Sequence, residues 1–245
     1  MIALAAVLGL ALGHGFDLLF DRLYTDRPPG GPLYRCGACR AAPAPLFLLP
    51  FIGYLRHGGR CPNCGALLPL RALLLPAGAA ALFALSNTEI DGFGAALLAG
   101  TFATIFLALT FTDLERRLIP NRVVYPSLLL AAAFSWAWPD WSVPQVFAGG
   151  LVGVGITLLL FVAGRGAFGF GDVKMAALMG LVVGLPNVLV GIFVSVFAAG
   201  AVVAPLLLLR VLHRRQYIPY GPFIALGAVI GLWWGQELWS WYVDR

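Results

Sequence analysis

Two aspartates stand in short motifs at the margins of apolar stretches. Asp113 lies in TFTDLERRLIPN, residues 110–121, and Asp172 lies in GFGDVK, residues 169–174. A charge inside a bilayer is costly, so such residues usually face a cavity, a partner or a substrate path. If the two carboxyl groups meet, they cannot both ionise easily. One keeps its proton while the other activates water, which is the division of labour in aspartic proteolysis.

The neighbours of the two aspartates have supporting roles in this hypothesis. Gly169 and Gly171 allow unusual backbone angles and the close approach of a peptide, and Pro120 stops a helix soon after the first aspartate. Lys174 follows the second aspartate by two residues, so it either turns inward or extends to the membrane surface. An aspartate at such an edge is also a common helix N-cap. Both interpretations of the aspartates stay open at this point.

All four cysteines fall in one segment, as Cys36-Gly-Ala-Cys39 and Cys61-Pro-Asn-Cys64, with 21 residues between the pairs. Two such pairs can hold one structural zinc ion, because thiolates are good zinc ligands and a short segment buries little core of its own. The separation is slightly above the commonest zinc-ribbon range. Two disulfides or four unbound thiols are the alternatives, and a cytoplasmic location disfavours disulfides. We expect zinc. His57 is a competing candidate for a ligand position, although an interfacial histidine near Arg56 and Arg60 is more often just solvated.

The elements that position these residues are long and apolar. Of the 245 residues, 60% are hydrophobic and 11% are charged, against roughly 25% charged residues in a soluble domain. This composition predicts an all-α polytopic membrane protein and leaves little room for a large soluble domain. A membrane span needs about 20 apolar residues, and the eight candidates are 1–20, 72–88, 92–112, 122–138, 146–164, 173–185, 187–210 and 217–241.

Basic residues fall in every second connection between the predicted spans. On this count 15 of the 16 Lys and Arg residues lie on one side and only Arg245 lies on the other. The positive-inside rule makes the first side cytoplasmic, so both termini face outwards. The distribution fits a protein surrounded by lipids, and it offers no clustered basic face for nucleic acid.

The predicted domain organisation follows from these patterns. Residues 1–20 form a first transmembrane helix, residues 21–71 form a cytoplasmic four-cysteine zinc domain, and residues 72–245 form a membrane domain of seven helices. The sequence contains no convincing internal repeat or heptad array, and it does not predict an oligomeric state.

Taken in order along the chain, the motifs resemble those of the type IV prepilin peptidases. The matching segments are TDLERRLIPN, which ends at Asn121, then GFGDVK, then IPYGPFIALGAVIG at 218–231, together with the two cysteine pairs of the first cytoplasmic loop. They cover nearly the whole chain in the family's order. Members of this family are membrane aspartic proteases of the bacterial inner membrane that remove leader peptides from prepilins and pseudopilins, and so serve type IV pili and protein secretion.

The resemblance implies roles for individual residues. Asp113 and Asp172 would form the catalytic dyad and cut a prepilin just after the glycine that ends its short basic leader. Glu115 would be a weaker contact for the cationic leader. The four cysteines would bind zinc, as in the longer members of the family. Many of those members also methylate the new N-terminus with S-adenosylmethionine.

The N-terminal motif departs from the family pattern. The family's Gly-Ser-Phe-Leu-Asn-Val followed by Arg-Leu-Pro aligns with GHGFDLLFDRLY at 13–24, where Asp17 replaces the asparagine, His14 the serine and Tyr24 the proline. Of the Arg-Tyr-Pro after the second cysteine pair only Arg71 remains. These departures lie away from the protease motifs. We therefore expect peptidase activity and leave methylation open.

Other classes of function are considered on the same residues. A transporter or channel would relay ions through the intramembrane carboxylates, often within paired inverted repeats, and no clear repeat is present. A non-enzymatic assembly protein is disfavoured because both aspartates are retained. Relatives of signal peptide peptidase and presenilin share the Gly-x-Gly-Asp motif. They place the first aspartate after a tyrosine, whereas Thr112 precedes Asp113 here, and they lack the cysteine loop.

Overall fold

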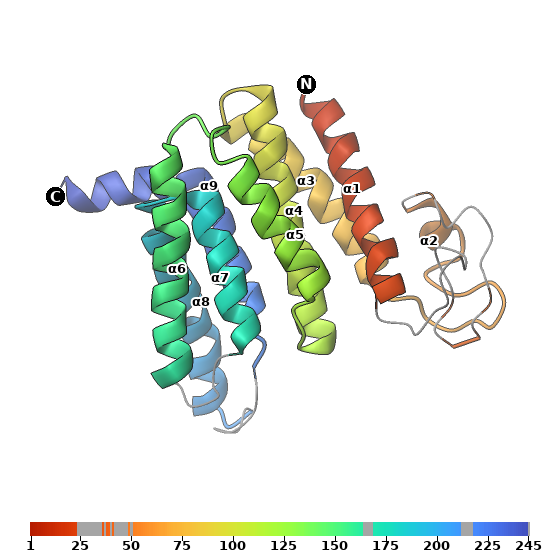
Figure 1. The fold of residues 1–245 in the computed structure, drawn as a ribbon. Helices are drawn as coiled ribbons and strands as arrows, with labels where there is room; N and C mark the ends of the chain where they lie inside the picture. The colour runs from red at the N-terminus through yellow and green to blue at the C-terminus, as the bar shows by residue number, and fades with distance from the viewer. Residues whose placement is uncertain are drawn as a thin grey trace.

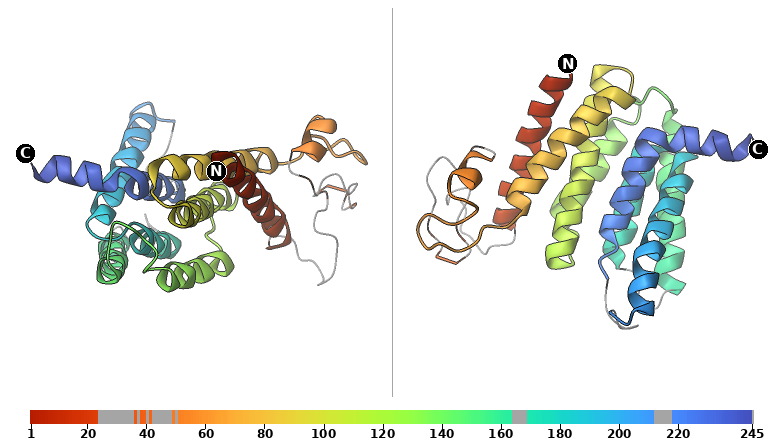
Figure 2. Two further views of the ribbon diagram at one scale, coloured as in Figure 1. Left: turned by 90° about the horizontal axis from the view of Figure 1, so that it is seen from above. Right: turned by 180° about the vertical axis from the view of Figure 1, so that it is seen from behind.

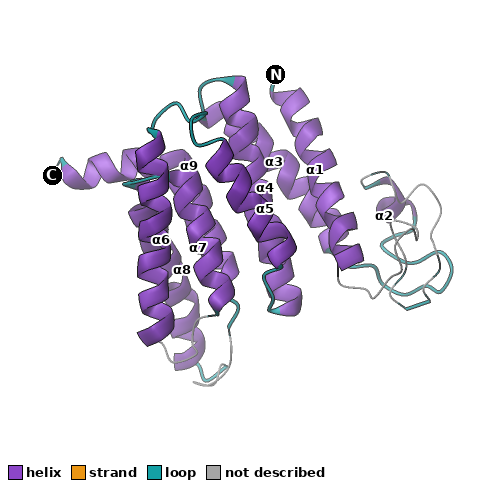
Figure 3. Cartoon of the chain, viewed as in Figure 1, coloured by secondary structure: helices purple, strands orange, loops and turns teal. Residues whose placement is uncertain are grey.

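A computed structural model gives the fold of the chain and describes residues 1–23, 36, 38–39, 41, 49, 51–163, 169–211 and 218–244. The described part is all-helical apart from one bridge between Arg60 and Leu67, and the predicted fold class is confirmed to that extent. Tyr24 lies outside the described residues. The helices, shown in Figures 1 and 3, are α1 (Ile2–Leu23), α2 (Ile52–Arg56), α3 (Arg71–Glu89), α4 (Phe93–Arg116), α5 (Asn121–Ala133), α6 (Val143–Ala163), α7 (Phe170–Val183), α8 (Asn187–Leu208) and α9 (Gly221–Val243).

The first three long helices, α1, α3 and α4, lie side by side (Figure 2). Glycines let α1 approach α3 closely, since a Cβ atom added at Gly9 would lie 2.5 Å from the carbonyl oxygen of Ala79. Small residues at helix interfaces are a common device in membrane proteins, where close backbone contact replaces the hydrophobic effect as the source of attraction. The short helix α2 belongs to the cysteine-bearing segment between α1 and α3.

The C-terminal helices pack in pairs through the same device. A Cβ atom at Gly149 of α6 would lie 2.4 Å from the carbonyl oxygen of Gly180 of α7, and one at Gly227 of α9 would lie 2.1 Å from that of Gly191 of α8. A larger side chain at any of these positions would separate the helices. The pairs α6 with α7 and α8 with α9 therefore form a tight second group.

Helix α4 joins the two groups, because it contacts α9 as well as α1 and α3. Large apolar side chains fill this junction and are almost completely buried. They come from α4, α7 and α9: Phe102, Phe106, Leu109, Met175, Leu178, Met179 and Ile224. Both predicted aspartates lie at one end of this junction, where α4 ends and where α5, α7 and α9 begin (Figure 1).

Within the described part of the chain five helices, α1, α3, α4, α6 and α8, are long and apolar enough to cross a membrane. The other three predicted spans correspond to α5, α7 and α9. Helices α5 and α7 have only 13 and 14 residues, or about 20 Å at 1.5 Å per residue, which is less than the hydrocarbon core of a bilayer. The end of α9 projects away from the other helices (Figures 1 and 2). The chain is a multi-pass membrane protein, and the eight-span count remains a prediction.

The outer faces of the long helices are apolar, as expected of helices in contact with lipid. Leu151 and Leu159 on α6 and Phe193 and Phe197 on α8 are each about 70% exposed. Such a surface is unusual for a soluble protein, in which large contiguous apolar patches are rare. The exposed side chains and the buried small residues together explain why the sequence is apolar throughout these helices.

Candidate active site and metal centre

Asp113 occupies the last turn of α4 and is almost completely buried, with 1% of its surface exposed. Its Oδ2 atom accepts a hydrogen bond of 2.8 Å from the backbone N–H of Gly221, the first residue of α9. The N–H groups at a helix N-terminus have no partner within the helix, so they bind anionic groups well. Gly221 needs to be a glycine, because a Cβ atom there would lie 2.7 Å from the same carboxylate oxygen.

Asp172 is the third residue of α7 and is also buried. Its Oδ2 atom accepts a 2.8 Å hydrogen bond from the N–H of Gly169, while the Asp172 N–H donates to the Gly169 carbonyl oxygen, so the first turn of the helix is closed locally. The other oxygen, Oδ1, is buried and has no hydrogen-bond partner among the described residues. The N-cap of α7 is Gly169, so Asp172 is not the N-cap itself: it closes the first turn from inside the helix with one carboxylate oxygen and leaves the other oxygen available.

The two carboxyl groups are close enough to interact electrostatically. Tyr220 lies beside them, because it interacts electrostatically with Asp172 while the next residue, Gly221, binds Asp113. The sequence alone indicated this stretch only as part of the segment 218–231 that resembles the family, and it predicted no role for Tyr220 or Gly221. The signal available was the Tyr-Gly-Pro sequence, since Pro at the start of a helix is well tolerated and favours a defined N-terminus.

The supporting residues tie the two aspartate motifs together. Gly171 packs against Ile119, because a Cβ atom there would lie 3.2 Å from the Ile119 side chain. Pro120 precedes α5, and Asn121 begins it. Lys174 does not turn towards Asp172 in the structure: its Nζ donates a 2.7 Å hydrogen bond to Asn121 Oδ1.

Two aromatic rings complete the surroundings of the Lys174 ammonium group. Its Nζ lies 5.2 Å from the ring centre of Tyr125 and 5.0 Å from that of Phe170. These distances suit cation–π attraction. The lysine therefore links the start of α5 to the start of α7 on the outside of the site.

Glu115 lies on the same turn of α4 as Asp113 but belongs to a different cluster. Its Oε2 accepts a hydrogen bond from Nη1 of the buried Arg71, which also pairs with Asp17 and Asp21 of α1. The sequence predicted Glu115 as a leader contact and noted Asp17 as a departure from a motif. It gave no indication that one arginine joins all three carboxylates, which are 44 to 54 residues away from it in the chain.

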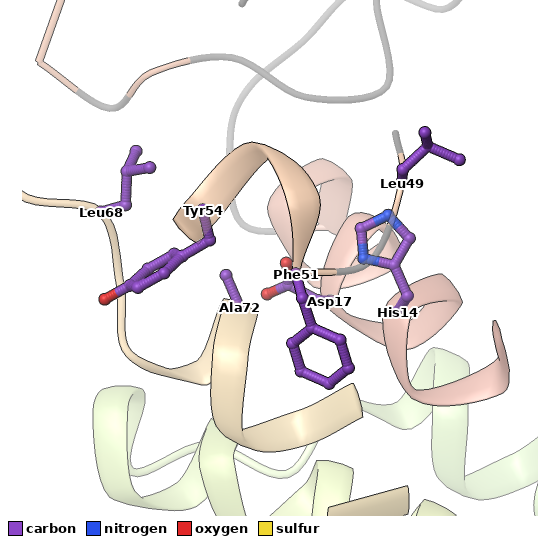
Figure 4. A pocket seen from close by; sticks show the side chains of 7 residues that line it. All are labelled: His14, Asp17, Leu49, Phe51, Tyr54, Leu68 and Ala72. Atoms are coloured by element: carbon purple, nitrogen blue, oxygen red, sulfur yellow. The ribbon is translucent and has the colours of Figure 1, made fainter. Parts of the chain in front are cut away.

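A pocket opens next to this cluster (Figure 4). It is lined by His14 and Asp17 of α1, by Ala72 of α3, and by four residues of the segment between these helices: Leu49, Phe51, Tyr54 and Leu68. Figure 4 draws the Asp17 carboxylate, the His14 imidazole and the Phe51 ring around the same space. Neither Asp113 nor Asp172 lines this pocket, so it is separate from the pair of aspartates.

The four cysteine sulfurs gather in one place, with all four Sγ atoms within 4.8 Å of one another. Cys36 Sγ lies 3.6 Å from Cys64 Sγ, and Cys39 Sγ lies 3.9 Å from Cys61 Sγ. Zinc–sulfur bonds of about 2.3 Å in a tetrahedron require sulfurs about 3.8 Å apart. The observed separations fit a four-thiolate zinc site and are far longer than a disulfide bond.

The backbone around the cysteines turns sharply and donates hydrogen bonds close to the sulfurs. Gly65 adopts φ +72°, which turns the chain after Cys64, and its N–H donates to the Cys61 carbonyl oxygen. A hydrogen bond from the backbone of Cys39 is the main cause that lowers the pKa of the Cys36 thiol to about 7, which favours the thiolate at this sulfur, whereas the neighbouring thiols raise the pKa of Cys64 to about 12. His57 is not part of the ligand group found among the described residues.

Sequence comparisons relate the chain to known proteins. The chain matches the description "Bacterial Peptidase A24 N-terminal domain" over residues 7–90 and "Type IV leader peptidase family" over residues 100–204. It is 27% identical to the "Prepilin leader peptidase/N-methyltransferase" of Bacillus subtilis over 99% of this chain and 98% of that protein. The protein of the same name from Aeromonas hydrophila is 29% identical, over 90% of this chain and 79% of that protein.

No solved structure matches the chain. The first match includes the cysteine segment and the second includes both aspartates, in the same order as in the motif-based resemblance. Matches of this kind over both parts, and over nearly the full length of the Bacillus protein, leave one conclusion: the chain belongs to the type IV prepilin leader peptidase/N-methyltransferase family.

Proposed function

We propose that Asp113 and Asp172 are the catalytic dyad with which this prepilin peptidase cleaves a leader peptide. The observation that carries the proposal is the arrangement of two buried, interacting carboxyl groups at one end of the helix bundle. Each has one oxygen held by a backbone N–H, and Asp172 keeps Oδ1 without a partner among the described residues. Two neighbouring carboxyl groups of this kind can share one proton, so that one is ionised while the other stays protonated.

In the proposed reaction one aspartate is ionised and the other is protonated. The ionised carboxylate takes a proton from a water molecule, whose oxygen attacks the peptide carbonyl carbon, while the protonated carboxyl group gives its proton to the carbonyl oxygen. The C–N bond then breaks as the carboxyl group that took the water proton gives it to the leaving nitrogen, while the other carboxylate takes back a proton from the new hydroxyl group of the tetrahedral intermediate. The two carboxyl groups titrate as a unit, so we assign neither role to one of them.

The proposed substrates are prepilins or pseudopilins, cut after the glycine that ends a basic leader. The helix ends that carry the aspartates are rich in basic residues, such as Arg116 and Arg117 where α4 ends and Arg122 in the first turn of α5. The positive-inside rule supports a cytoplasmic position for this end. Family membership supports the bacterial inner membrane as the location.

We extend the proposal to the membrane arrangement. Helices α5, α7 and α9 would lie in the membrane together with the five longer helices, which gives eight membrane segments with both termini outside. Support comes from the burial of α7 against α5, α6 and α9. Because α7 is too short to span a bilayer alone, Asp172 at its start would lie below the level of the headgroups.

The experiment on the dyad uses a peptide with a short basic leader ending in Gly-Phe. Purified wild type, Asp113→Asn and Asp172→Asn are compared in the same detergent or lipid, with Asp140→Asn as a matched control because Asp140 is exposed at the opposite end of the bundle. We expect cleavage after the glycine by the wild type and the control, and none by the two dyad variants. Full cleavage by either dyad variant contradicts the proposal.

We also propose that Cys36, Cys39, Cys61 and Cys64 bind one structural zinc ion. Zinc would give this segment the stability that its small core of Cys36, Cys61 and Leu68 does not supply. Metal analysis should find zinc in the wild type and in the control Asn63→Ala, which changes an exposed residue between two ligands. Cys39→Ser should lose the metal and lower the melting temperature. Retention of zinc by Cys39→Ser would contradict the assignment.

Methyl transfer from S-adenosylmethionine to the new N-terminus is a second activity, supported by the N-methyltransferase named in the relatives. Asp17 stands at the position of the motif's asparagine and pairs with Arg71. The cleaved peptide, incubated with labelled S-adenosylmethionine, should gain one methyl group. Cleavage without any methylation in both the wild type and Asp17→Asn would limit the protein to the peptidase reaction.

A further inference from the structure

Arg71 is the centre of an ion cluster that joins three helices. It is the first residue of α3 and only 7% of its surface is exposed. Its Nε lies 2.9 Å from Asp17 Oδ1, its Nη2 lies 2.7 Å from Asp21 Oδ1, and its Nη1 pairs with Glu115 Oε2. Each guanidinium nitrogen thus has a different carboxylate, two on α1 and one on α4. Only the planar fork of an arginine can make these three contacts at once.

The cluster acts on the turn of α4 that carries Asp113. Glu115 follows Asp113 by two residues, which in a helix turns the side chain by roughly 200°, to the opposite side. Asp113 therefore faces the N-terminus of α9 and Glu115 faces α1 and α3. The helix ends directly afterwards, at Arg116. The last turn of α4 is thus held from two opposite sides by two unrelated contacts.

We propose that Arg71 is a positioning residue of the peptidase, which holds Glu115 and so fixes the last turn of α4 on which Asp113 lies. The proposal rests on the proposed role of Asp113. It gives Arg71 a part in the peptidase reaction. It also replaces the expectation that Glu115 contacts the leader. Arg71 is itself held in place by α1, because it pairs with Asp17 and Asp21 of that helix.

The two roles for Glu115 give different kinetics. A carboxylate that binds the basic leader contributes to substrate affinity, so its loss raises KM. A carboxylate that positions the catalytic turn has no contact with the leader, and its loss lowers kcat with little change in KM. Whether the loss of the Glu115 carboxylate changes kcat or KM therefore decides between the two roles. An ion pair that only stabilises the fold changes neither constant of the folded enzyme.

The test compares Glu115→Gln with Glu89→Gln in the full-length protein, with the same leader peptide. Glu89 accepts a hydrogen bond of 3.0 Å from Trp234 Nε1. It is a matched control because it also links two helices through a carboxylate, at the other end of α3. We expect Glu115→Gln to lower kcat on the order of 10- to 100-fold, with KM within about two-fold of the wild type. Glu89→Gln should keep the wild-type constants.

A double-mutant cycle connects the effect to Arg71. Arg71→Lys keeps the charge but cannot serve three carboxylates, so it should also lower kcat. The double variant Arg71→Lys with Glu115→Gln should be no slower than Arg71→Lys alone, because both changes break the same contact. If Arg71→Lys does not fold, the kinetics of Glu115→Gln decide by themselves.

Three results would overturn the positioning role: a rise in KM with unchanged kcat in Glu115→Gln, unchanged constants in that variant, or fully multiplicative losses in the cycle. Asp113→Asn and Asp172→Asn are measured in the same series. If they cleave as well as the wild type, the proposed dyad fails. If they are inactive while Glu115→Gln retains its kcat, only the positioning role fails.

Discussion

The two aspartates of the candidate active site are held in very different ways. Asp172 receives its N–H bond from Gly169, three residues earlier in the same turn. Asp113 receives its N–H bond from Gly221, which is 108 residues away and begins another helix. On its other side the turn of Asp113 depends on Glu115 and Arg71. One carboxylate is thus placed by local geometry and the other by the packing of α1, α3, α4 and α9.

This difference indicates which parts of the protein control activity. A capping interaction within one turn survives small movements between helices, because both partners move together. A contact between two helices is lost when either helix shifts, and small misplacements of a catalytic group are costly in rate. We therefore expect the Asp113 side to be more sensitive to remote substitutions than the Asp172 side. Three predictions test this comparison.

The largest effect is expected from Gly221→Ala. The new Cβ atom would lie 2.7 Å from Asp113 Oδ2, so the carboxylate must move while the fold is retained. We expect kcat to fall on the order of 100-fold with zinc content unchanged. Gly200→Ala on α8 is the control, since a Cβ atom there has no neighbour within 4 Å. Equal activity of the two variants would mean that Gly221 does not place Asp113.

A smaller effect is expected at the corresponding position beside Asp172. A Cβ atom at Gly171 would lie 3.2 Å from Cβ and Cδ1 of Ile119, which requires a shift of only a few tenths of an ångström. Gly171→Ala should lower kcat about ten-fold, and Ile119→Val, which removes Cδ1, should restore part of it. A loss as large as that of Gly221→Ala would remove the proposed asymmetry between the two sides.

The smallest effect is expected from Lys174→Gln, which loses the ammonium group over Tyr125 and Phe170 and the charge on the bond to Asn121. These contacts lie on the outside of the site, so we expect a loss of about 1 kcal/mol in unfolding free energy. Cleavage should fall only a few-fold. Lys174→Arg is the control that keeps the charge. A loss of activity equal to that of Asp172→Asn would instead make Lys174 part of the catalytic group.

Much of the fold was predictable, because apolar runs and their flanking residues identify helices. The predicted stretches 92–112 and 187–210 correspond to α4 and α8 with small differences at the ends. The predicted stretch 122–138 is longer than α5, which ends at Ala133 although Phe134 and Trp136 continue the apolar run. Composition does not distinguish an apolar turn from an apolar helix, so the short length of α5 was not visible in the sequence.

The sequence by itself determined the chemistry available to this protein: four cysteines in two pairs, two aspartates in ordered motifs, and apolar helices to carry them. It also determined the local closure of Asp172, because the spacing to Gly169 is that of one helical turn. Only the tertiary structure decided that Gly221 binds Asp113 and that Arg71 joins Glu115 to α1. Contacts between distant segments depend on which helices pack together, and that depends on many weak interactions along their whole length rather than on the pair of residues involved.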